Sequence, residues 1–152
     1  MRKLLLFALA LASAATSAET PNAVISATGT LYLTFDIGMG NHTEGVLMGR
    51  FVPDASSLGK FPAMNASDYP GSVSYITVRP STKVLKAVVG AEEAARLSHD
   101  RMRIVQVPVQ IVLGHYAPVV ECDARTYRAT LVSVKPIGKL QVAKRDDAPI
   151  GC

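Results

Sequence analysis

The chain has 152 residues, which suits a single domain large enough to bury a hydrophobic core without metals or many crosslinks. Its 16 Lys and Arg outnumber its 12 Asp and Glu, for a formal net charge of +4, and no basic block after the N-terminus is longer than Lys144 and Arg145. This balance argues against nucleic acid and anionic lipid as partners, because both require a dense basic surface.

The N-terminus has the pattern of a secretory signal peptide, residues 1–18. Arg2 and Lys3 come first, an apolar run covers residues 4–12, and small residues lead to a cleavage site after Ala18. The apolar run is too short to cross a bilayer comfortably, and no Cys near the cleavage site could accept a lipid. We therefore expect a periplasmic or secreted mature chain, residues 19–152, without a membrane anchor. Cleavage removes two basic residues and leaves a chain that is close to neutral.

Alternation of apolar and polar residues predicts three strands in the first half of the mature chain. The segment between the first two, residues 38–45, is rich in turn formers. Residues 53–71 are rich in Pro, Gly, Ser, Asn and Asp without a sustained period, so we expect a long loop there. A break in phase at Tyr75 and Ile76 suggests a β-bulge in the third strand. The expected strands are residues 30–37, 46–52 and 72–79.

One helix is expected next, within residues 82–102, starting either at Thr82 or only after Gly90. Residues 104–113 then have an aliphatic side chain at every odd position, which makes this the clearest strand in the chain. Pro108 cannot donate to a ladder, so we expect this strand to be at an edge or bulged at that residue. A second loop is expected at residues 114–125. The last expected strands are residues 126–135 and a short one around Leu140 and Val142.

Cys122 and Cys152 are the only two cysteines, and in an oxidising compartment such an even set favours one disulfide. The bond would attach the C-terminus to Cys122 and, if unstrained, contribute roughly 3–4 kcal/mol in the chain-entropy account. A redox or metal-binding pair is the rival interpretation, but the chain has no CxxC motif and no matching Cys and His spacing.

The order of elements, three strands, a helix and two strands, is that of the OB-fold. With its signal peptide and its closing strand Tyr127-Arg128-Ala129-Thr130-Leu131-Val132-Ser133-Val134, the chain resembles small exported bacterial proteins with OB-like barrels, many of unknown function. The resemblance implies a mainly β protein, a five-stranded Greek-key barrel with its helix between strands three and four. A β-sandwich with one helix is the alternative fold.

The resemblance also implies a binding region, because in OB-folds the loops between strands one and two and between strands four and five border the usual binding face. Here those loops are residues 38–45 and 114–125, which we expect to lie at the same end of the barrel. These two loops hold the highest density in the chain of side chains that can bind a ligand. The candidate binding residues are His42, Glu44, His115, Tyr116, Glu121 and Asp123.

The same residues raise the question of a metal site. Two imidazoles with a carboxylate would suit zinc or copper, but no HxH, HExxH or His triplet fixes such a geometry, so we expect no metal and no cofactor. No phosphate-binding GK[ST] or GxSxG motif is present either. We therefore expect a non-enzymatic binding or protein-interaction module for an envelope protein or small ligand. A metal-dependent periplasmic hydrolase is the alternative.

Overall fold

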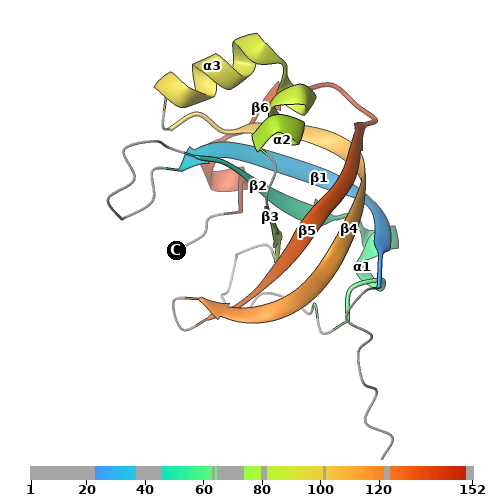
Figure 1. Ribbon diagram of the computed structural model, residues 1–152. Helices are drawn as coiled ribbons and strands as arrows, with labels where there is room; N and C mark the ends of the chain where they lie inside the picture. The colour runs from blue at the N-terminus through green and yellow to red at the C-terminus, as the bar shows by residue number, and fades with distance from the viewer. Residues whose placement is uncertain are drawn as a thin grey trace, which may run out of the picture.

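Five strands close into a mixed barrel in the order β1, β2, β3, β5, β4, and β4 pairs back onto β1 (Figure 1). This computed structural model describes residues 23–36, 46–62, 64, 74–79, 82–100, 102–121 and 124–149. Neighbouring strands of the barrel are antiparallel except β3 and β5, which are parallel. The strands are β1 (Ile25–Asp36), β2 (Val46–Pro53), β3 (Ile76–Arg79), β4 (Val105–Glu121), β5 (Ala124–Pro136) and β6 (Gln141–Val142). The helices are α1 (Ala55–Leu58), α2 (Thr82–Val89), α3 (Ala91–His99) and the 3-10 helix η1 (Arg145–Asp147).

Closure of the barrel confirms the OB-like fold. The decisive strand is β1, in which Gly29 pairs with Pro53 of β2 on one side and with Val109 of β4 on the other. A strand shared by two ladders leaves no sheet edge at this point, so the β-sandwich alternative is wrong. The helices α2 and α3 lie between β3 and β4 in the chain, as the OB-like order requires.

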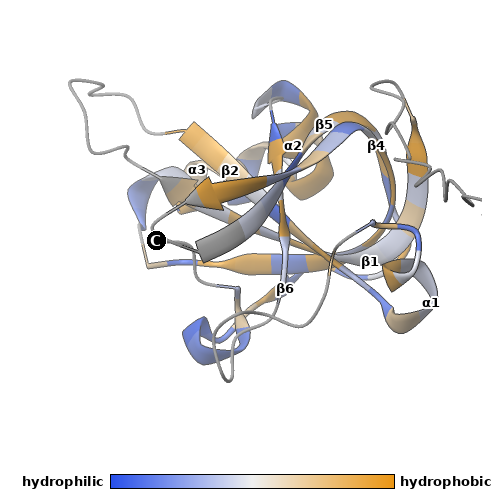
Figure 2. Cartoon of the chain, turned by 90° about the horizontal axis from the view of Figure 1, so that it is seen from below, coloured by the Kyte–Doolittle hydropathy of each residue, from blue (hydrophilic) through white to orange (hydrophobic). Residues whose placement is uncertain are grey.

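The hydrophobic core fills the barrel and extends to the two helices. Leu85 of α2 and Leu97 of α3 are 1% and 0% exposed, so α2 and α3 cover the end of the barrel at the top of Figure 1. Hydrophobic colour runs along much of β2 and β4 in Figure 2. Each fully buried side chain of this size contributes roughly 1.5–3 kcal/mol. The largest are Phe51, Leu31, Leu33, Ile76, Leu85, Leu97, Ile111 and Leu113.

The region predicted as one helix contains two. Gly90 separates them with a φ of 83°, a left-handed conformation that glycine adopts without a steric penalty. Its N–H donates to the carbonyl of Lys86 and closes α2, and its carbonyl accepts from the N–H of Ala94 and opens α3. The apolar spacing continued across Gly90, which is why the sequence pattern did not show that the chain turns there.

The predicted loop at residues 114–125 is wrong for most of its length. The strand β4 continues to Glu121 and β5 begins at Ala124. Pairing between them shifts register on both sides of Gly114 and resumes at Ala117 with Arg128, and His115 lies in this bulge with a φ of 49°. The alternation stops at the bulge, so the sequence pattern ended the strand there although the ladder continues beyond it.

Three smaller expectations also change. The phase break at Tyr75 is the start of β3 at Ile76 rather than a bulge, because β2 and β3 pair without a register shift. The predicted loop at residues 53–71 contains the helix α1. Pro108 does not lie on an edge strand, because β4 pairs with β1 along this stretch. On the other side of β4, the ladder with β6 ends at Gln106 and the ladder with β5 starts at Val109, so Pro108 lies between these two ladders.

The helix α1 is tied to β1 by a small polar cluster around Asp54. The Asp54 carboxylate accepts from the N–H of Ser57 at 2.9 Å, as an N-cap residue does, and from the hydroxyls of Thr28 and Ser56 at 2.5 and 2.7 Å. The hydroxyl of Ser57 in turn accepts from the N–H of Thr28 at 2.9 Å. The hydrogen bonds from Thr28 and Ser56 lower the pKa of Asp54 to about 2.

We expect Asp54→Asn to lower the stability of the protein most at neutral pH. The pKa is depressed on folding, so the carboxylate stabilises the folded state above its ordinary pKa of 3.8, and this contribution is lost as the pH falls through about 2. The thermal midpoints of the two proteins should therefore differ by a constant amount above pH 5 and converge as the pH falls from 4 towards 2. A difference that is independent of pH would contradict this role for the charge.

Candidate functional site

The structure describes only part of the predicted binding region. His42, Glu44, Asp123, Cys122 and Cys152 lie outside the described residues. Glu121 is placed as the last residue of β4, and its side chain is outside the description. His115 is exposed and Tyr116 is half-buried.

The two predicted loops leave opposite ends of one ladder. The strand β4 begins beside the end of β1, where Val105 pairs with Leu33, and leaves the ladder where Leu113 pairs with Ile25. It then bends around the barrel, so that the ends of β1 and β4 point to the same side of Figure 1 from different walls. Residues 38–45, the first predicted loop, lie outside the described residues, so the expected proximity of the two loops stays a prediction.

Tyr116 belongs to an aromatic cluster. Its ring stacks on Tyr127 of β5, with centroids 5.8 Å apart and planes 7° apart, and its other neighbour is Phe61 at 5.3 Å. Phe61 packs edge-on against the buried Phe51 at 6.3 Å. The Tyr116 hydroxyl donates to the carbonyl of Pro62 at 3.0 Å. These contacts give Tyr116 a structural role, and a binding role for it stays a prediction.

A groove that the sequence pattern did not indicate lies where α2 and α3 meet the ends of β1 and β2. Phe35 and Leu47 line it from the strands, and its volume is about 650 Å³. This volume is within the range of about 300–1,000 Å³ that is usual for small-molecule sites. From α3 it is lined by small side chains at helical spacing, a pattern that could have revealed it: Ala91, Ala94, Ala95 and Ser98.

The helix α2 gives this groove its charge. Lys83 and Lys86 both line the groove and are exposed, three residues apart on one face of α2. In the part of the chain that the structure describes, no hydrogen bond or ion pair engages either side chain. The groove therefore combines an apolar lining with two exposed ammonium groups.

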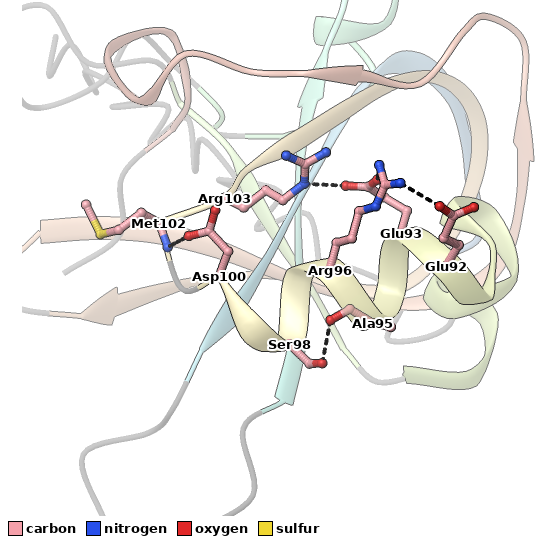
Figure 3. Close-up of polar contacts among 8 residues, drawn as sticks. All are labelled: Glu92, Glu93, Ala95, Arg96, Ser98, Asp100, Met102 and Arg103. Carbon is pink, nitrogen blue, oxygen red and sulfur yellow. Dashed lines mark hydrogen bonds and ion pairs between the residues drawn. The ribbon is translucent and has the colours of Figure 1, made fainter.

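An ion-pair cluster holds α3, and with it one wall of the groove, in position (Figure 3). The Nε of Arg103 donates to Glu93 at 2.5 Å, and the Glu93 side chain is only 12% exposed. Arg96 pairs with Glu92 at 2.5 Å and with Glu93 at 3.7 Å. The hydrogen bond from Arg103 lowers the pKa of Glu93, and the same bond raises the pKa of Arg103. The cluster thus links α3 to the segment that leads into β4.

We expect Glu93→Gln to lower the free energy of unfolding by about 1 kcal/mol, because it weakens a half-buried charged hydrogen bond between two elements. Glu92→Gln is the matched control, because both residues lie in the first turn of α3 but Glu92 is 82% exposed and pairs only within the helix. Its effect should stay below about 0.5 kcal/mol. Urea unfolding of both variants measures the difference, and equal losses would contradict a linking role for Glu93.

Within the described ranges, no group of three or more His, Cys, Asp or Glu could hold a metal ion. No described helix is long and apolar enough to cross a membrane. Comparisons with protein-family models, with curated proteins and with solved structures found no match to the chain.

Proposed function

We propose that the chain is an exported, non-enzymatic binding module whose ligand site is the groove between α2, α3 and the ends of β1 and β2. The observation that carries the proposal is the groove itself, with Phe35 and Leu47 on one wall and Lys83 and Lys86 on the other. It replaces the predicted pair of loops as the proposed site, because residues 114–121 continue the strand β4.

The lining favours a small amphiphilic anion, a single apolar chain that ends in a carboxylate. An apolar chain would remove the exposed surface of Phe35, Ala91 and Ala95 from water, at roughly 25 cal/mol for each Å² buried. The two exposed ammonium groups would orient the carboxylate. Exposed ion pairs contribute little, about 1 kcal/mol or less each, so the lysines select the ligand and the apolar wall supplies most of the affinity.

The test is calorimetric titration of dodecanoate, below its micellar concentration, into the mature protein. We expect Lys83→Glu with Lys86→Glu to weaken binding about tenfold or more, because two attractions become repulsions. Lys135→Glu with Lys139→Glu changes the net charge equally at exposed positions that do not line the groove, and should leave the affinity unchanged. Dodecanol, which has no charge, should bind more weakly than dodecanoate. Equal affinity in the two double variants, or no binding to the unmodified protein, would overturn the proposed site.

We also propose that residues 1–18 direct export in a bacterial host and that Cys122 and Cys152 form a disulfide in the mature periplasmic or secreted protein. The charged start, short apolar run and small residues before Glu19 support the first part, and the even cysteine count supports the second. Intact mass of the protein from the cell envelope should show a chain that starts at Glu19 and is two hydrogens lighter than the reduced form. An uncleaved N-terminus, or two free thiols, would contradict the corresponding part.

A further inference from the structure

The outer face of the barrel carries a row of polar and aromatic side chains across four strands. Tyr32 of β1 pairs with Arg50 of β2, Arg50 pairs with Thr77 of β3, and Thr77 pairs with Arg128 of β5. Directly paired residues project to the same side of a sheet, so these four side chains form one row. Their chain neighbours, such as Leu31 and Phe51, face the core.

This outer row is partly covered. Thr77 is only 7% exposed, although its neighbours Ile76 and Val78 occupy the inner face. The Nε atom of Arg128 is buried as well. Arg50 and Tyr32 are half-buried. Outward side chains of a barrel strand are this enclosed only when another part of the molecule packs on them.

One part that packs there is the C-terminal tail, residues 144–149, which follows β6 on the side of β1 and β2 (Figure 1). The Nη1 of Arg50 donates to the carbonyl of Pro149 at 3.1 Å. Ala148 is 8% exposed and Pro149 is buried. Burial first, and then the charge of Asp147, raises the pKa of Tyr32.

The contacts show which chemistry this face accepts. Ala148 has φ −92° and ψ 143°, the extended conformation that a residue before proline prefers. The Arg50 guanidinium also lies over the ring of Tyr75, 5.5 Å from its centroid. A cation beside an aromatic ring thus faces an extended Ala-Pro step that follows two acidic residues. Aromatic-lined surfaces are a usual means of binding proline-containing peptides, and the cation favours acidic ones.

The tail is held by few bonds. Its backbone hydrogen bonds are internal, from Asp147 to Lys144 at 3.1 Å and from Ala148 to Arg145 at 3.3 Å. Among the described contacts, its hydrogen bonds to the rest of the protein are the one from Arg50 and a weak one from Arg145 to the sulfur of Met102 at 3.9 Å. The last ladder pair before it is Val142 with Val105. Residues 144–149 can therefore leave this face without breaking a strand ladder. The Cys122–Cys152 disulfide proposed above would keep a released tail close to the barrel, so the tail would still compete with a partner.

We propose that the outer face around Tyr32, Arg50 and Tyr75 binds an extended, acidic, proline-containing segment of a partner protein, and that residues 144–149 occupy this face in the free protein as an internal competitor. The Pro149 carbonyl of the tail accepts a hydrogen bond from Arg50, and the charge of Asp147 acts on Tyr32, so a partner segment of the same chemistry would gain the same interactions. This interaction surface does not depend on the proposed groove, because the two share no residue.

The experiment uses the full mature chain and a labelled peptide of residues 144–149. In one variant the tail is weakened by Asp147→Asn with Pro149→Ala. Because an internal competitor lowers the apparent affinity in proportion to its occupancy, we expect the weakened variant to bind the peptide about tenfold more tightly than the unmodified chain. Fluorescence anisotropy measures both affinities. A peptide with the same two substitutions should bind several-fold more weakly to either protein.

Adding Arg50→Gln to the weakened variant should abolish peptide binding, and Tyr75→Ala should weaken it, while Glu92→Gln on α3 should have no effect. A thermal midpoint within a few degrees of that of the unmodified chain shows that a variant is folded. If the Arg50→Gln variant does not fold, Tyr75→Ala tests the face in its place. Equal peptide affinity for the unmodified and weakened chains, or no binding to either, overturns the proposal. So does a dimer of the unmodified chain that forms with rising concentration and is lost in the weakened variant, since the occupant would then be the tail of a second copy.

Discussion

Gly29→Ala should destabilise the protein by about 3 kcal/mol or more, because the barrel has no space for a methyl group at this position. A Cβ at Gly29 would overlap the carbonyl oxygen of Val52 and lie 2.8 Å from the ring of Phe51. The carbonyl belongs to the backbone of β2, and the ring is fully buried, so neither can move away cheaply. Since Gly29 pairs with both β2 and β4, any shift strains two ladders. Urea unfolding measures the loss.

Gly59→Ala is the matched control. A Cβ at Gly59 meets nothing within 4 Å, and its φ of −65° suits any residue. We expect no loss of stability, and a gain of about 0.5 kcal/mol from the reduced freedom of the unfolded chain. A loss as large as that of Gly29→Ala would mean that crowding is not the cause.

The second large effect is expected from Phe51→Ala, with a loss of about 3–5 kcal/mol. Phe51 is 0% exposed and packs edge-on against Phe61, which connects the core to the aromatic cluster of Tyr116 and Tyr127. Truncation removes the buried ring and leaves a cavity. Phe51→Leu keeps most of the volume and should cost about 1 kcal/mol. Similar losses for both variants would contradict the cavity explanation.

Combining Gly29→Ala with Phe51→Ala tests the geometry of the clash. Removal of the ring frees part of the space for the new methyl group, while the carbonyl of Val52 still blocks it. The double variant should therefore lose at least 0.5 kcal/mol less than the sum of the single losses, the range expected for residues in contact. Strict additivity would show that the Phe51 ring does not restrict Gly29.

The sequence predicted the barrel where the alternation was unbroken. The predicted strands at residues 30–37 and 104–113 overlap β1 and β4, and the order of elements predicted the OB-like barrel. The early part of β1, residues 25–29, was missed because it contains Gly29, whose missing side chain has no hydropathy signal. The end of β4 was missed because a bulge around His115 interrupts the period while the ladder continues.

The candidate sites were less predictable. The groove is formed by side chains from β1, β2, α2 and α3, which come together only after the barrel closes. The tail contact is also between distant residues, Arg50 and Pro149. Local patterns carry no information on such pairings. His42, Glu44 and the other loop residues were predicted to bind a ligand because of the chemistry of their side chains. His42 and Glu44 lie outside the described residues, and their binding role stays a prediction.

The pairing of β1 with β4 also sets the order in which the protein can fold. Ile25 pairs with Leu113, and Leu33 pairs with Val105, so one wall of the barrel cannot form until residues much later in the chain have been synthesised. The contacts that close the barrel are therefore non-local, and chains dominated by such contacts fold slowly, in milliseconds to seconds. Until β4 and β5 arrive, β1, β2 and the short β3 can pair only as an open sheet that lacks two of the barrel's strands. Slow closure of this kind would suit the proposed export, because a newly made chain would stay unfolded for longer.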